Sequence, residues 1–258
     1  MAPFQINRML ANEAAMSDFS LLDLIALVWY IVAWGLFGWL TDYGRWHRGS
    51  LSRLMDRERQ NWMHALTKRD VRMVDTAIMG SLQNGTAFFA STSLIALGAS
   101  LTLLNQSDRV FTIVSELPVA MLTPTKQALE FKVLGLAVVY GYAFFKFGWA
   151  YRLYNYAAIL IGAIPPLSED PAIVRRATER AADMQVHAGH HFHWGLRSLF
   201  FSIGYLGWFV GPIVFLFSST LIVVILTRRQ FWSPARLALL DQTRPNDPGG
   251  DQGVSGPG

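Results

Sequence analysis

The amino-acid sequence predicts an all-α fold, a polytopic membrane helical bundle with four transmembrane helices and amphipathic cytoplasmic helices. Of the 258 residues, 52% are hydrophobic and only 16% are charged, which is too apolar for an ordinary soluble domain. The apolar residues gather in runs long enough to cross a bilayer as helix, and basic residues flank these runs. The lipid bilayer is therefore the expected partner, and nucleic acid is not, because the net charge is only +4 and no basic tail is present.

One four-helix transmembrane domain with cytoplasmic helical segments is expected over residues 20–232, after an N-terminal extension at 1–19 without a signal-peptide pattern. Its first span, residues 24–41, contains eighteen residues without a charge, enough to cross roughly 30 Å of hydrocarbon. Residues 42–72 then place apolar side chains at helical spacing between charged ones, and Ser50 or Ser52 is positioned to cap that helix. We expect the first apolar run to remain in the mature protein.

The second and third spans are expected over residues 78–104 and 133–151. Both contain polar side chains that hydrocarbon cannot satisfy, so we expect these side chains to face protein. A short interfacial helix is expected in the connection between the two spans, residues 105–130. The polar residues in question are Gln83, Asn84, Ser91 and Lys146.

The second cytoplasmic segment is expected over residues 152–198, and its helix has Pro171 in the first turn. An apolar stripe at spacings of three and four residues runs along this helix from Ile173 to Phe192 and requires a partner surface. The fourth span is expected over residues 199–227 with a kink at Pro212. Residues 233–258 are rich in Pro, Gly, Asp and Gln and are expected to be a disordered tail.

The distribution of Lys and Arg predicts the orientation. Residues 42–72 and 152–198 contain thirteen of these side chains, and the segments on the other side contain eight. The positive-inside rule therefore places both basic segments in the cytoplasm and both termini outside. Because Arg228 and Arg229 stand directly at an outer boundary in this arrangement, they count against it. The expected location is the inner (plasma) membrane of the cell.

Five short stretches of the sequence are distinctive: RQNWM at 59–63, NGTAFFAST at 84–92, YRLYNY at 151–156, GLRSLFF at 195–201 and WFVGP at 208–212. Together they resemble the DUF599 family, a family of bacterial and plant integral membrane proteins defined as a domain of unknown function. The resemblance extends over about residues 17–232, and it implies the membrane class without implying an activity, a substrate or a catalytic residue.

Lys146 is the ionisable residue inside a predicted span, which makes it a functional candidate by default. One interpretation is that Lys146 extends to the headgroups or pairs with Asp75 or Asp70, as long basic side chains near helix ends usually do. The other is that polar side chains of the bundle interior share a cavity that admits an anion or an anionic headgroup. The residues expected in this interior are Lys146, Arg152, Gln83, Asn84, Ser91 and Asp75.

Four side chains before the fourth span suggest a metal or haem site. At 100° per residue, Glu179, Asp183, His187 and His190 fall within about 80° of one helix face, and imidazole and carboxylate are ligands of zinc, iron and copper. The alternative is that this face is simply the solvated side of the helix, opposite the apolar stripe. The cofactor therefore stays unknown at this point, with a transition metal or haem as the candidates.

Three function classes follow from these features. The leading hypothesis is a transport, channel or complex-assembly role through an oligomeric helical bundle, with no enzymatic activity. The alternative is a metal- or haem-binding membrane protein that uses the His187/His190 face, and the third is a structural subunit of a larger membrane complex. Absence of cysteine excludes thiolate chemistry, and no nucleotide-binding, serine-nucleophile or metalloprotease motif is present.

Overall fold

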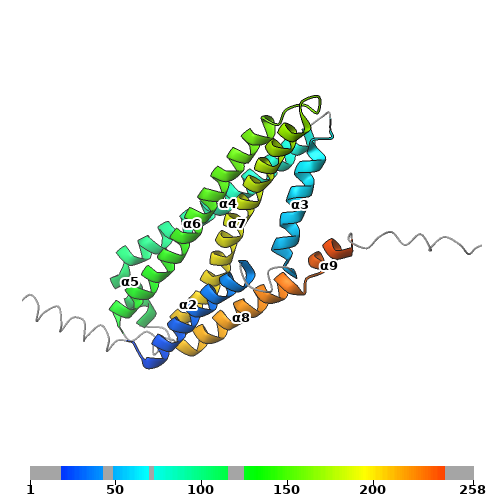
Figure 1. Ribbon diagram of the computed structural model, residues 1–258. Helices are drawn as coiled ribbons and strands as arrows, with labels where there is room; N and C mark the ends of the chain where they lie inside the picture. The colour runs from blue at the N-terminus through cyan, green and yellow to red at the C-terminus, as the bar shows by residue number, and fades with distance from the viewer. Residues whose placement is uncertain (1–18, 43–48, 70–72, 116–124, 242–258) are drawn as a thin grey trace, which may run out of the picture.

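The computed structural model describes residues 19–42, 49–69, 73–115 and 125–241, and every element in these ranges is a helix. Figure 1 shows long helices side by side in an elongated bundle. The helices are α2 (Leu21–Asp42), α3 (Leu51–Leu66), α4 (Met73–Asn105), α5 (Ser107–Ser115), α6 (Lys126–Gly162), α7 (Pro171–Val210), α8 (Pro212–Phe231) and α9 (Pro234–Asp241).

Four helical segments are long and apolar enough to span a membrane, which confirms the predicted fold class. Three of them, α2, α4 and α6, contain the first three predicted spans. The four segments are Leu21–Asp42, Met73–Asn105, Lys126–Gly162 and Pro212–Leu240.

The fourth span differs from its prediction, because residues 199–227 do not form one kinked helix. The chain breaks at Gly211, which has an extended backbone with φ of 161° and ψ of 165°. Pro212 has no N–H to donate to the carbonyl of Trp208 and disfavours the helical conformation at the residue before it. Helix α8 consequently turns back along α7, and Ser218 Oγ donates to the Gly204 carbonyl at 2.6 Å.

Helices α2 and α7 run antiparallel over the same depth. At one end Trp208 Nε1 donates to Asp23 at 2.7 Å, and at the other end Arg197 pairs with Asp42 at 3.1 Å. Long side chains of α7, from Arg197 to Trp208, therefore link the two ends of α2 to α7. Because α8 reverses direction after α7, the beginning of α2 and the end of α8 lie at opposite ends of this depth (Figure 1).

Beyond the end of α2, helices α4, α6 and α7 continue together and α3 packs against α7 (Figure 1). Ser50 caps α3 by accepting a hydrogen bond from the Arg53 N–H, and Pro171 opens α7, as the sequence predicts. The apolar stripe of α7 finds its partner here, because Ala177, Ala181 and Ala188 are buried in one cluster with residues of α3 and α6. Ile173, at the start of the stripe, is 45% exposed.

A second core fills the other end of the bundle with aromatic rings. Tyr30 of α2 contacts Phe201 and Tyr205 of α7 and Phe215 of α8 with ring centroids 5.2 to 5.7 Å apart. The ring of Trp208 stacks on Phe215 at 5.1 Å. Offset and edge-to-face contacts of this kind pack densely, so the space between α2, α7 and α8 is filled with side chains at this depth.

Two short helices complete the fold. Helix α5 follows α4 directly and is the helix expected in the connection 105–130. Helix α9 lies in the segment expected to be disordered, and Arg236 Nε donates to the Gly49 carbonyl at 2.6 Å, which attaches α9 to the start of α3. The expectations for residues 1–18 and for 242–258 lie outside the described residues.

Candidate functional site

A carboxylate at the end of α2 organises a polar layer with α7. Asp42 accepts hydrogen bonds from Trp194 Nε1 at 2.7 Å and from both terminal nitrogens of Arg197 at 3.2 and 3.1 Å. Arg197 also donates to Thr41 Oγ1 at 3.0 Å. The Arg197 side chain is only 11% exposed, so its charge is held by this carboxylate. The layer marks the level at which α2 leaves the apolar region.

A second carboxylate, Asp56 of α3, joins α3 to α7 and is 1% exposed. It accepts from Arg59 Nη1 at 2.9 Å and lies 2.9 Å from His190 Nε2. Gly189 makes room for the arginine, because a Cβ there would lie 2.6 Å from Arg59 Cζ. Asp56 thus holds one side chain from its own helix and one from α7, and a buried carboxylate needs such partners.

A cavity of about 160 Å³ lies beside the Asp42 layer, where α2, α3, α7 and α8 meet. We call it the interfacial cavity, because both polar and apolar side chains line it. Gln230 Nε2 of α8 donates to Ser52 Oγ of α3 at 2.8 Å and closes one edge. The lining residues are Phe37, Thr41, Leu51, Ser52, His193, Leu196, Arg197, Phe200, Leu226, Arg229 and Gln230.

The charged groups of this cavity are cationic. The guanidinium of Arg229 lies over the Phe200 ring, with 5.2 Å between Cζ and the ring centroid, and no carboxylate of the described residues forms an ion pair with it. Burial and the nearby charge of Arg59 lower the pKa of His193 to about 4, so the ring, which lies before the apolar part of α7, is neutral at neutral pH. The cavity therefore favours an anion.

The six residues expected in a shared polar interior do not meet. Gln83 Nε2 donates to Asn155 Oδ1 at 2.7 Å between α4 and α6, whereas Asn84 and Ser91 are exposed on the outer face of α4. Lys146 packs its ammonium over Trp194, 4.4 Å from the ring centroid. Such cation–π contact offsets part of the cost of placing the ammonium there.

Asp75 and Arg152 have separate local partners. Asp75 accepts from Trp62 Nε1 at 2.7 Å and from Arg69 Nη1 at 2.8 Å, so it ties α3 to α4 and is unavailable to Lys146. Arg152 is exposed and donates to the Tyr156 hydroxyl one turn along α6 at 2.6 Å. Both residues stabilise local packing in this arrangement.

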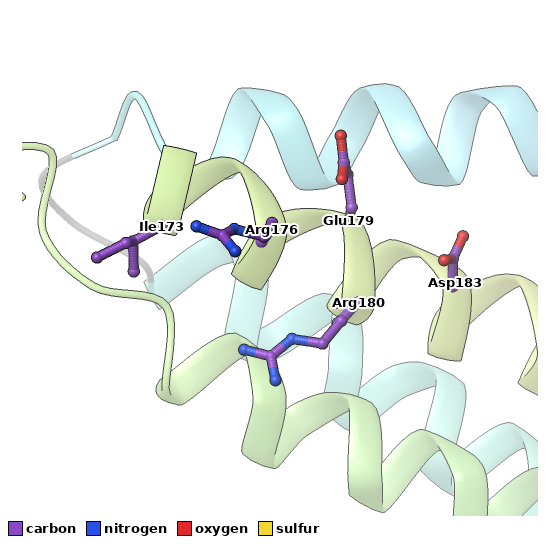
Figure 2. Close-up of a pocket in the computed structure, with 5 residues that line it drawn as sticks. All are labelled: Ile173, Arg176, Glu179, Arg180 and Asp183. Carbon is purple, nitrogen blue, oxygen red and sulfur yellow. The ribbon is translucent and has the colours of Figure 1, made fainter. Parts of the chain in front are cut away.

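The four residues of the expected metal face are spread along α7. Figure 2 shows the carboxylates of Glu179 and Asp183 on the same side of the helix, at the wall of a surface hollow of about 590 Å³, with Arg180 pointing away from them. His187 is exposed, and His190 is engaged with Asp56. Within the described residues, no three His, Asp or Glu side chains lie close enough together to hold one metal ion.

Lys132 is a buried cation that lies just before the predicted third span, residues 133–151. Its side chain is fully enclosed between α6 and α7, and Nζ donates to the Trp208 carbonyl at 2.9 Å. This carbonyl is the one that Pro212 leaves without a donor, so Lys132 satisfies the end of α7. A sequence signal existed, because Lys132 shares one helix face with the buried Ala128, Leu129 and Leu136.

The outer face of α4 presents small and polar side chains that repeat every seven residues. Asn84, Ser91 and Gly98 form one row, and Gly85, Thr92 and Ala99 form the row beside it, all of them exposed. A seven-residue repeat of small residues is typical of helices that pack against another helix in a membrane. We call these six residues the α4 seam.

Comparison with known proteins gives one match. The model of a family described as "Protein of unknown function, DUF599" matches residues 25–235, which is most of the chain. No curated protein and no solved structure matches the chain.

Proposed function

The chain belongs to the DUF599 family, and from that premise we propose that this multi-pass membrane protein binds an anionic group at the interfacial cavity. The single observation that carries the proposal is the charge of the cavity wall. Two guanidinium groups, Arg197 and Arg229, line it, and none of the lining residues that the structure describes is acidic. A guanidinium is the side chain best suited to phosphate and carboxylate.

The start of α3 adds to this charge. Leu51 and Ser52 are the first two residues of the helix and both line the cavity. Backbone N–H groups in a first helical turn have no acceptor within the helix, and the helix dipole places partial positive charge there. Of the two arginines, Arg197 is largely neutralised by Asp42, which leaves Arg229 as the cation available to a ligand.

We propose the inner membrane as the location, with α3 and the ends of α6 and α8 on the cytoplasmic side. In this arrangement the end of α7 is a further pass beside the four span-length segments, because the chain reverses at Gly211, so Arg228, Arg229 and Arg236 join the basic segments 42–72 and 152–198. This arrangement agrees better with the positive-inside rule than one with both termini outside. Labelling of Ser20→Cys and Ser233→Cys variants in intact cells tests it, with labelling of Ser20→Cys alone expected from an impermeant reagent.

The binding proposal is tested with sn-glycerol 3-phosphate, a water-soluble phosphate monoester, as the anionic probe. Arg229→Gln is expected to weaken its binding to the purified protein about tenfold, the typical value of a lost charge-assisted hydrogen bond. Arg228→Gln is the matched control, because it removes the same charge from the preceding residue, which does not line the cavity. Equal losses in both variants, or no binding to the unmodified protein, contradict the proposal.

Assembly through the α4 seam is a second candidate function. The seam is exposed in one copy, and a second α4 with the same repeat is a complementary partner. Because the chain contains no cysteine, Ser91→Cys introduces a single thiol into the seam. Oxidation is expected to give a disulfide-linked dimer for Ser91→Cys and none for Val138→Cys, an exposed position of α6. Equal cross-linking at both positions argues against the seam.

A further inference from the structure

A second cavity adjoins the interfacial cavity and is almost entirely apolar. It is a groove of about 210 Å³ between α2 and α8, and two residues, Phe37 and Thr41, line both spaces. We call it the α2–α8 groove. The remaining lining residues are Trp29, Val32, Ala33, Leu36, Leu40, Val223, Thr227 and Phe231.

The length of the groove matches one leaflet of a bilayer. Trp29 and Thr41 are its outermost residues on α2, and twelve residues of helix rise about 18 Å. One half of the hydrocarbon core is roughly 15 Å thick. An acyl chain that begins at the level of Thr41 therefore lies along the groove for most of one leaflet.

The two adjoining spaces differ in the chemistry of their walls. The described lining of the groove carries no charged side chain, whereas Arg197 and Arg229 line the cavity. A ligand that fills both needs an anionic head and an apolar tail. A detached phosphate or carboxylate satisfies only the cavity, and an uncharged alkyl chain satisfies only the groove.

We propose that the ligand is an anionic lipid, with its headgroup in the interfacial cavity and one acyl chain in the α2–α8 groove. This inference rests on the proposed function and names the class of ligand that the same site takes. Arg229 contacts the anionic headgroup, and the start of α3 faces it. Phe37 and Thr41 lie at the junction of headgroup and chain, and Val32 and Leu36 contact the chain.

The charge of the cavity also selects among lipids. An anionic headgroup gains the attraction of Arg229 and of the α3 dipole without adding a cation to the site. A zwitterionic headgroup of the choline type brings a quaternary ammonium into a space that already contains Arg197 and Arg229. Binding is therefore expected to distinguish lipids by headgroup charge at constant chain length.

The experiment uses the full-length protein in detergent, with dioleoyl phosphatidylglycerol, dioleoyl phosphatidylcholine and sn-glycerol 3-phosphate as probes. Val32→Trp fills the groove, and Val28→Trp, an exposed position of α2 one turn away that does not line it, is the control. Val32→Trp is expected to weaken phosphatidylglycerol binding about tenfold, which corresponds to roughly two methylene groups removed from contact. Glycerol phosphate binding is expected to be unchanged in both variants.

The outcomes separate this inference from the proposal on which it rests. Tighter binding of phosphatidylglycerol than of phosphatidylcholine, together with loss only in Val32→Trp, supports the lipid. If phosphatidylglycerol and glycerol phosphate bind equally well and Val32→Trp changes neither, the ligand is a headgroup-sized anion and the lipid assignment is wrong. If neither anionic probe binds in an Arg229-dependent way, the proposed function itself fails.

Discussion

Replacement of Asp42 by Asn tests whether the polar layer holds α2 against α7. The substitution preserves the size of the side chain and one acceptor for Trp194 Nε1, but it removes the negative charge between the two Arg197 nitrogens. It also places an amide N–H₂ near a guanidinium, so at least one of the two hydrogen bonds to Arg197 is lost. The Arg197 side chain, 11% exposed, then has no carboxylate beside it.

The expected loss of stability follows from this geometry. Removing one partner of a fully buried ion pair costs about 3 to 5 kcal/mol, but Asp42 is 24% exposed and water screens part of that penalty. A loss of about 2 to 3 kcal/mol in the free energy of unfolding is therefore expected. For a chain of this length the corresponding decrease in Tm is about 4 to 12 °C.

Thermal unfolding of the full-length protein in detergent, followed by circular dichroism, measures this change. Asp108→Asn is the matched control, because the same substitution there removes a carboxylate that is 87% exposed and pairs with Lys126 on the surface. Its Tm is expected to be unchanged within error. A decrease in Tm that is equal in both variants, or absent in Asp42→Asn, refutes the structural role of the Asp42 layer.

Two further predictions follow from the packing. Gly195→Ala is expected to lower the free energy of unfolding by about 1 to 3 kcal/mol, since a Cβ there lies 2.7 Å from the buried Phe147 ring. Gly141→Ala, with no atom within 4 Å of its Cβ, is the control and is expected to be neutral or stabilising. Urea titration of both variants measures the change in the free energy of unfolding. Elemental analysis of the purified protein tests the metal hypothesis. His190 is engaged with Asp56, and no three metal-ligating side chains converge in the described residues. We therefore expect less than one zinc, iron or copper ion per chain, and the same metal content in His187→Ala. A stoichiometric metal that disappears in His187→Ala contradicts this expectation.

Much of the fold was predictable because its signals are local. An uncharged run such as residues 24–41 identifies a span by composition alone, and the Ser50 cap and Pro171 mark helix starts by short-range chemistry. The apolar stripe of α7 indicated a buried face, and Ala177, Ala181 and Ala188 are indeed buried. The sequence did not indicate which helices cover that face, because the contacts involve residues far apart in the chain.

The reversal at Gly211 shows where the local signals were insufficient. An apolar run with an internal proline is compatible with a kinked helix or with two helices in a hairpin. The hairpin forms here because Lys132, far away in sequence, satisfies the freed Trp208 carbonyl, and because Gly204 and Gly207 let α8 approach α7 closely. The predicted orientation counted one span over residues 199–227, where the structure has the end of α7 and the separate helix α8, and the side expected for Arg228 and Arg229 depends on that count.

The sequence by itself determined the membrane class, the helical composition and the family, because hydropathy and motif residues are properties of short segments. Tertiary structure alone decided the site. Arg197 and Arg229 come from different helices, and their shared cavity exists only because α8 folds back beside α7 and α3 begins next to it. Whether a polar side chain of α4 lies in the bundle interior or on its surface likewise depends on which face of α4 the neighbouring helix covers. Gln83 faces α6, whereas the adjacent Asn84 is exposed.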